Sequence, residues 1–164
     1  MSGSNHIAGG VAFTGVFCSF WDVNIFINPW YLVATIFFSL LPDLDHSKAP
    51  ISKLFAFTRL PQYLDVNFGH RTITHSLVVY IPAILFIYIL EGLFGVTVRV
   101  YTLIFSLSYM SHLIFDMMAV SGVPLFFPFK KNPCVLPANP DYRLKSADKK
   151  SSGVIFGLFC GIIF

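Results

Sequence analysis

Charged residues are scarce in this chain. Asp, Glu, Lys and Arg together supply 12% of its 164 residues, whereas a soluble domain carries about 25%. Hydrophobic residues supply 55%, including 19 Phe, and a core of this size cannot shield that much apolar surface from water. The composition therefore argues against a soluble domain and predicts a single membrane domain over residues 1–164.

Paired cysteines and dense basic runs are missing too. The cysteines at 18, 134 and 160 are far apart and lack CxxC spacing, which argues against a disulfide framework or a thiolate metal site. The formal net charge is only +3, so we expect no nucleic-acid partner. Residues 1–6 carry no Lys or Arg, and no small-residue cleavage site follows them. We therefore interpret the N-terminus as a retained segment and not as a signal peptide.

Apolar runs divide the chain. They cover residues 7–20, 25–41, 75–96, 98–120 and 153–164. The first is short for a membrane span, which needs about 20 residues, and the last is either a short packed helix or a span whose end lies beyond this chain. The predicted fold class is therefore all-α: a polytopic membrane bundle of four to five helices, one of them short, with polar loops at about 42–74 and 121–152.

The distribution of basic residues predicts the orientation. Every Lys and Arg of the chain except Arg99 lies in the two polar stretches. With four spans before the second stretch, both stretches and the N-terminus fall on the same side. Short loops rich in Lys and Arg are cytoplasmic. We therefore expect a multi-pass protein of the inner membrane with a cytoplasmic N-terminus.

The histidines converge on that same face under this topology. The topology used only apolar runs and basic residues, so the convergence is independent support for a site. The polar candidates at this face are His6, Asp43, Asp45, His46, His70, His75, His112 and Asp116.

His112 and Asp116 are four residues apart in an apolar run and therefore share one helix face. An Asp in the hydrocarbon region costs about 2.5–3.5 kcal/mol to insert, so it normally faces the protein interior and has a partner. The pair offers two metal ligands on one helix face, as an HExxH helix does. A hydrogen bond that merely joins two helices is the alternative interpretation.

Two further motifs lie at the ends of apolar runs, one after the run 25–41 and one at the start of the run 75–96. Asp43 and Asp45 come directly after Pro42, which ends a run, and can turn back over the helix end to bind a cation; ordinary turns at a helix end are the alternative. His70 and His75 are five residues apart, so they converge only if His70 still lies in the loop. Arg71 between them suits a phosphate or an oxyanion.

The ordered set of motifs resembles the YdjM-type inner-membrane proteins from His6 to about residue 145. The motifs are Leu41-Pro42-Asp43-Leu44-Asp45-His46, Gly69-His70-Arg71-Thr72-Ile73-Thr74-His75-Ser76, Ser111-His112-Leu113-Ile114-Phe115-Asp116 and Gly122-Val123-Pro124-Leu125-Phe126-Phe127-Pro128-Phe129. The resemblance implies a membrane-bound metal-dependent hydrolase, similar in ligand pattern to zinc-dependent phospholipase C. It implies metal ligation by His6, Asp43, His70, His75, His112 and Asp116, with Asp45 as a further candidate. Where the family often carries a Glu before its last span, this chain has Lys149-Lys150-Ser151-Ser152.

The expected function is a hydrolase with one or two metals at the cytoplasmic face. Zinc fits His with carboxylate best and manganese comes second. The catalytic candidates are Asp45 or His46, to orient a ligand or carry a proton, and Arg71, to steady an anionic oxygen. Location at the interface favours membrane lipid as a partner and an anionic or lipid-linked phosphoester as the substrate.

Two other function classes remain open. One is a non-enzymatic subunit or effector of a larger protein complex that uses the cluster structurally. The other is a metal or proton transporter, although only Glu91 offers an ionisable group near the opposite face. Metal analysis followed by a phosphodiesterase assay separates the three.

Overall fold

Two short hydrophobic helices begin the fold of the computed structural model, which describes residues 2–94 and 98–143. Helix α1 covers Gly3–Ser19 and α2 covers Pro29–Leu40. Asn28 starts α2 because its side chain accepts the Trp30 N–H and Pro29 has a backbone already set for the first turn. Pro42 then tightens the chain into the 3₁₀ helix η1, Leu41–Asp45.

The polar stretch after η1 is helical as well. It contains α3 (Pro50–Leu54), the 3₁₀ turn η2 (Ala56–Thr58) and α4 (Leu60–Phe68). Gly69 ends α4 with a positive φ of 78°, a conformation that costs glycine little. The segment at 42–74, predicted as a polar loop, is therefore folded into short helices.

Two long helices complete the bundle. Helix α5 covers Leu77–Phe94 and α6 covers Arg99–Met117, and both are long and apolar enough to cross a membrane. Helix α1, with 17 residues, and α2, with 12, are shorter than a full span. The prediction of an all-helical protein is confirmed: within the described ranges the only extended pairing is the isolated bridge between Val123 and Cys134. The predicted last span, 153–164, lies outside the described residues.

Helix α6 is the centre of the bundle, with α1, α2 and α5 packed around it. Small residues let α1 approach closely: a Cβ added to Gly9 would lie 2.3 Å from the Phe115 ring, and one added to Gly10 would lie 2.5 Å from Ser39 Cβ. Thr14 and Ser108 join α1 to α6 by a hydrogen bond of 3.0 Å. Close packing of this kind is typical of membrane helices.

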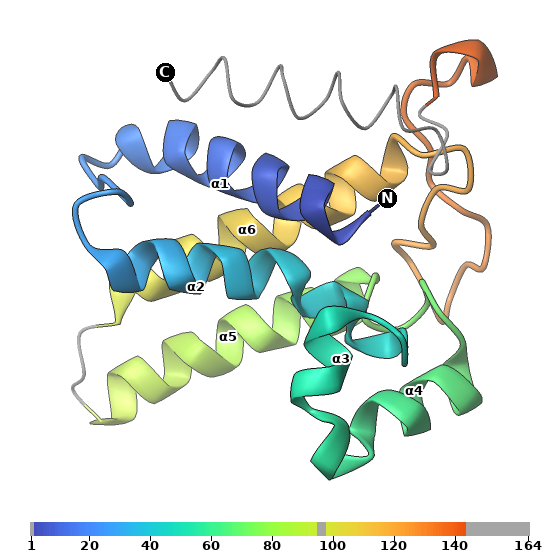
Figure 1. The fold of residues 1–164 in the computed structure, drawn as a ribbon, viewed down its shortest axis with the longest axis horizontal. Coiled ribbons are helices and arrows are strands. Elements are labelled where there is room, and N and C mark those ends of the chain that lie inside the picture. The colour runs from blue at the N-terminus through green and yellow to red at the C-terminus, as the bar shows by residue number, and fades with distance from the viewer. Residues whose placement is uncertain (1, 95–97, 144–164) are drawn as a thin grey trace.

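The topology brings the first polar stretch and residues 121–143 of the second to one end of the bundle (Figure 1). In Figure 1 the α1–α2 turn, the end of α5 and the start of α6 lie at the left, whereas η1, the start of α5 and the end of α6 lie at the right. The short segment η3, Pro140–Tyr142, also lies at the right. The right-hand end therefore contains the histidines.

Candidate metal centre

Four donor side chains from three segments meet at the right-hand end of the bundle. Asp43 comes from η1, His75 lies two residues before α5, and His112 and Asp116 are one turn apart on α6. One ligand atom from each lies within 4.8 Å of all the others. His75, His112 and Asp116 have no exposed side-chain surface, whereas Asp43 retains 14%.

The separations between these donors match the spacing of ligands around one cation. His75 Nε2 and His112 Nε2 are 3.2 Å apart. Asp43 Oδ1 lies 3.8 and 3.6 Å from these two nitrogens, and Asp116 Oδ2 lies 3.5 and 3.6 Å from them. Ligands about 2.0 Å from a tetrahedral zinc are about 3.3 Å from one another. The four side chains therefore already have nearly the spacing that a metal requires.

The outer hydrogen bonds of the two imidazoles direct their lone pairs inward. His112 Nδ1 lies 2.7 Å from the Ser39 carbonyl oxygen, and His75 Nδ1 lies 3.3 Å from Asp45 Oδ2. Carbonyl and carboxylate oxygens only accept, so both Nδ1 atoms carry hydrogen and both Nε2 atoms of the neutral rings carry lone pairs. Two lone pairs that face each other at 3.2 Å would repel, so either a metal ion or a proton shared by the two rings occupies the space between them.

Asp45 supports the centre from behind. Its carboxylate accepts from His70 Nδ1 at 2.9 Å, from the Thr74 hydroxyl at 2.6 Å and from the Arg71 amide at 3.0 Å. Burial alone would raise the pKa of Asp45, but the hydrogen bonds from His70, His75 and Thr74 outweigh burial and hold this pKa well below its usual range. Asp45 therefore stays ionised and holds the chain between Gly69 and His75 in place.

His6 lies next to the four donors without being one of them. Its ring stacks on the His112 ring with centroids 3.6 Å apart, and its Nε2 lies 3.4 Å from Asp116 Oδ1. Neither ring nitrogen has a hydrogen-bond partner within the described part of the chain. Buried donors without partners are unusual in proteins, so His6 is a candidate ligand for a second ion that would share Asp116.

His70 and His46 lie outside the four-donor cluster. His70 is bound to Asp45, and its ring stacks on that of His46 with centroids 4.6 Å apart. His70 was expected to ligate directly, but the structure gives its Nδ1 to the carboxylate that orients His75. Gly69, with its positive φ, ends α4, and His70 lies in the loop that follows. The His70 ring is held by its bond to Asp45 and so does not join the four donors.

Arg71 also has a partner that its sequence position does not reveal. Its backbone is left-handed, with φ of 61°, and its guanidinium bonds to Ser121 and lies 3.0 Å from Asp116 Oδ1. The Arg71 Nε is buried without a hydrogen-bond partner among the described residues. The guanidinium therefore offsets the negative charge of Asp116, and its buried Nε–H makes no hydrogen bond to the described residues.

Several supporting residues carry no sequence signal for a site. The Ser39 carbonyl sets the tautomer of His112, and the Tyr109 hydroxyl donates to the Thr74 carbonyl. Ser and Tyr inside apolar helices more often join helices than support a metal. Only the distance between segments far apart in sequence identifies their role.

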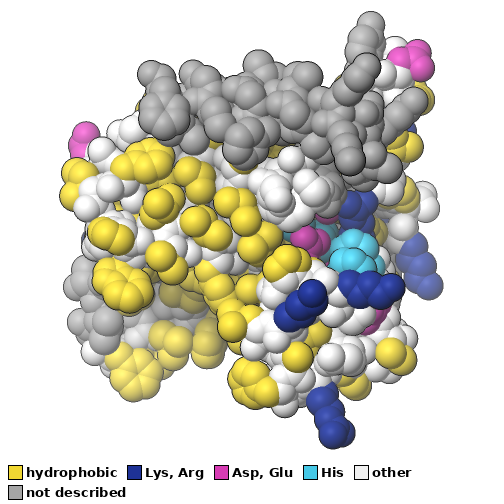
Figure 2. All heavy atoms as spheres, in the orientation of Figure 1, with side chains coloured by type: hydrophobic (Ala, Val, Ile, Leu, Met, Phe, Trp, Pro, Cys, Tyr) yellow, Lys and Arg dark blue, Asp and Glu magenta, His cyan; other side chains and the backbone are white. Residues whose placement is uncertain are grey.

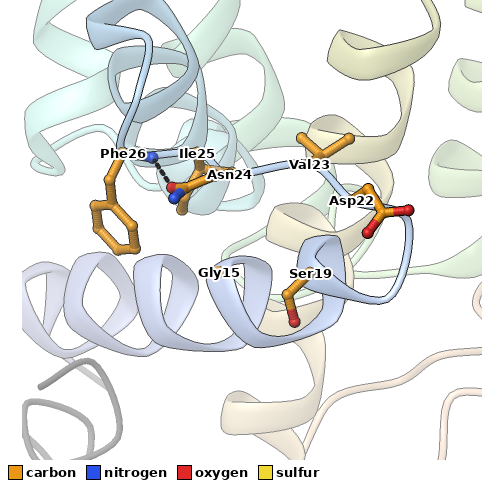
Figure 3. Close-up of a pocket in the computed structure, with 7 residues that line it drawn as sticks. All are labelled: Gly15, Ser19, Asp22, Val23, Asn24, Ile25 and Phe26. Atoms are coloured by element: carbon orange, nitrogen blue, oxygen red, sulfur yellow. Dashed lines mark hydrogen bonds between the residues drawn. The ribbon is translucent and has the colours of Figure 1, made fainter.

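Side-chain types on the surface are distributed unevenly between the two ends of the bundle, as the buried donors are. In Figure 2 hydrophobic side chains cover the left part of the visible face, whereas the visible histidines lie at the right, among basic and acidic side chains. A hollow of about 340 Å³ lies at the opposite end of α1, between Gly15 and the α1–α2 turn. Figure 3 shows that Asn24 shapes it by accepting the Phe26 N–H at 2.9 Å. Its lining contains no histidine, and the one group of donors spaced for a metal among the described residues is the cluster at the right-hand end.

Comparison with known proteins identifies relatives that are named as membrane proteins. The family model described as YdjM inner membrane protein matches residues 1–163. The chain is 30% identical over 138 residues to the inner membrane protein YdjM of Escherichia coli strain K12, a match that covers 78% of this chain and 66% of that protein. It is 30% identical over 132 residues to the uncharacterized protein YvsG of Bacillus subtilis strain 168, covering 78% of this chain and 74% of that protein. No solved structure matches significantly.

The family match covers almost the whole chain, including every donor of the centre. The resemblance drawn from the four motifs is confirmed. Two helices suited to a membrane and a buried Asp/His cluster at one end are consistent with it. The chain belongs to the YdjM family of inner membrane proteins.

Proposed function

We propose that the protein is a membrane-bound metal-dependent hydrolase whose site faces the cytoplasm and acts on a phosphoester, with a lipid-linked phosphoester as the preferred class. The observation that supports a bound metal is the distance of 3.2 Å between the Nε2 atoms of His75 and His112. In each ring the Nδ1–H is already bonded to another acceptor. A divalent cation satisfies both lone pairs and neutralises the carboxylates of Asp43 and Asp116.

Zinc is the metal that this donor set favours, with manganese second. Two imidazoles and two carboxylates are borderline ligands, which zinc accepts in tetrahedral geometry. Manganese prefers more oxygen ligands and a larger coordination number. The two imidazole nitrogens are 3.2 Å apart and each carboxylate oxygen lies 3.5–3.8 Å from both of them, which fits the smaller, tetrahedral arrangement.

The hydrolytic assignment depends on what surrounds the donors. A bound divalent metal that takes a water as a fifth ligand, beside the four protein donors, would activate that water and polarise a phosphoryl oxygen. The partly exposed Asp43 gives this centre an edge toward solvent. The buried Nε–H of Arg71, which has no hydrogen-bond partner among the described residues, could donate to an anionic oxygen that enters beside it. Asp45 keeps the proton on His75 Nδ1 and so preserves the lone pair on Nε2.

Metal analysis and a hydrolysis assay on one preparation test this proposal. We expect protein purified without chelator to contain at least one equivalent of zinc or manganese. We also expect it to hydrolyse a phosphodiester such as bis(p-nitrophenyl) phosphate or a lipid phosphoester, and to lose activity with chelator and regain it with metal. Protein that holds no metal and takes up none on titration would contradict both parts, because a proton shared by the two imidazoles would then explain their approach.

A structural metal site is the second candidate, and one observation favours it. Three of the four donors are wholly buried, and four protein ligands close the coordination of a structural zinc. The chain would then be a membrane subunit or effector of a larger complex. Stoichiometric metal without hydrolysis of any phosphoester would favour this candidate.

We also propose a multi-pass topology of four to five spans with a cytoplasmic N-terminus. The position of residues 42–74 and 121–143 at the same end of the bundle (Figure 1), with their basic side chains, supports it. In a background whose cysteines are replaced by alanine, Trp21→Cys should react with an impermeant maleimide in intact spheroplasts. Asp141→Cys should react only after lysis. Labelling of Asp141→Cys from outside would contradict the orientation.

A further inference from the structure

The lobe formed by residues 48–68, which contains α3, η2 and α4, presents an unusual outer surface. Large hydrophobic side chains occur at every third position along it, and all are at least 43% exposed. They are Leu54, Phe57, Leu60, Tyr63 and Val66, and the exposed fractions of Phe57 and Val66 reach 84%. A folded protein does not leave a row of apolar groups to water without a reason.

The same surface is basic. Lys48, Lys53 and Arg59, the three basic residues of the lobe, are all exposed. Asp65 is the lone acidic residue of the lobe, and its carboxylate is directed to the backbone, where it accepts the Ser47 N–H at 3.2 Å. The outer surface of the lobe therefore combines apolar groups with positive charge that no acidic residue of the lobe offsets.

The lobe is firmly attached on its inner side. Ile51 and Pro61 are buried, and the buried Ser52 hydroxyl lies 3.2 Å from the carbonyl oxygens of both Asp43 and Leu44. Helices α3 and α4 pack on η1 and project from the bundle at the right-hand end in Figure 1. The attachment leaves the apolar row and the three basic side chains exposed on the lobe.

We propose that this surface lies in the headgroup region of the membrane and binds anionic lipid. Segments that insert apolar groups just below the headgroups while Lys and Arg bind lipid phosphates have this composition. Tyr63 suits the depth of the headgroups, where aromatic side chains concentrate. The partner is the anionic leaflet of the membrane in which the bundle is embedded.

This placement has a consequence for the centre, which rests on the proposed function. The lobe is bonded to the backbone of Asp43, a donor of the cluster. A lobe held at headgroup depth holds the partly exposed edge of the centre at the same depth. The substrate phosphate would then be one carried by a lipid and not one free in the cytosol.

Tryptophan quenching in reconstituted full-length protein tests the placement. Trp21 and Trp30 are replaced by phenylalanine, and Phe57→Trp supplies the only indole. In vesicles with phosphatidylglycerol we expect a blue-shifted emission, strong quenching by lipids brominated near the top of the acyl chain, and weak quenching by acrylamide. Asp141→Trp, at an exposed position outside the lobe, is the control and should show the opposite pattern.

Charge reversal in the Phe57→Trp protein tests the contribution of anionic lipid. Each basic side chain at an anionic surface changes binding about fivefold, so Lys53→Glu with Arg59→Glu should greatly reduce the quenching of the indole at position 57 by brominated lipid. Lys130→Glu with Lys131→Glu makes the same change outside the lobe and should leave the quenching unaltered.

Two results would overturn the placement. One is quenching of the indole at position 57 by acrylamide as strong as that of the control, and the other is shielding of this indole from both quenchers by a protein partner. Neither readout depends on metal or activity, so the placement and the hydrolase can fail separately.

Discussion

Replacement of His112 by alanine is expected to lower the affinity for zinc or manganese by more than about 100-fold, because even residues that only orient ligands contribute about 10- to 100-fold. The ring supplies one of the two facing nitrogens, and its other nitrogen is fixed by the Ser39 carbonyl. Its loss leaves His75 and two carboxylates, so the site keeps only one of its two imidazole ligands. Metal content of purified protein, with titration of the apoprotein, measures the effect.

His46→Ala is the matched control for this experiment. His46 stacks on His70 but contributes no atom to the four-donor cluster, so its removal should leave metal content unchanged. His112→Asn separates ligation from packing, since an amide can still donate to the Ser39 carbonyl but provides no imidazole lone pair. If His112→Asn keeps its metal, His112 is not a ligand, and its bond to the Ser39 carbonyl serves only to join α6 to α2.

Asp45→Asn is expected to weaken metal binding about 10- to 100-fold while the helices remain folded, the range measured when residues that orient ligands are changed. The carboxylate accepts hydrogen bonds from His70, His75 and Thr74 at once. An amide at that position presents N–H groups to ring nitrogens that also carry hydrogen. His75 would then turn or change its tautomer, and its Nε2 would no longer offer a lone pair to the centre.

Asp65→Asn makes the same chemical change in the same polar stretch and serves as the control. Its carboxylate accepts the Ser47 N–H and contributes no donor to the centre. Isothermal titration of the two apoproteins with zinc, with circular dichroism to check the helices, should show weaker binding for Asp45→Asn alone. Equal affinities for the two variants would mean that Asp45 stabilises the loop but does not orient His75.

The sequence was sufficient for the features that depend on local chemistry. Apolar runs predicted the long helices α5 and α6 because lipid demands a minimum length of apolar chain. The four-residue spacing placed His112 and Asp116 on one face because the helix repeats about every 3.6 residues. Pro42 predicted the turn that returns Asp43 to the bundle end, since proline cannot continue a helix.

Only the tertiary structure decided how the candidates divide their roles. Asp43 and Asp45 are two residues apart with the same chemistry, yet one reaches the four-donor centre and the other binds His70 and the back of His75. His6 and His70, both expected as ligands, lie beside the centre and behind it. These differences arise from contacts between residues 25 or more apart in sequence, such as the Ser39 carbonyl that turns His112 Nε2 inward. The Nε2 lone pair of each ring is directed at the centre because its Nδ1–H is bonded to an acceptor on the opposite side. Only the tertiary structure places those acceptors beside the rings.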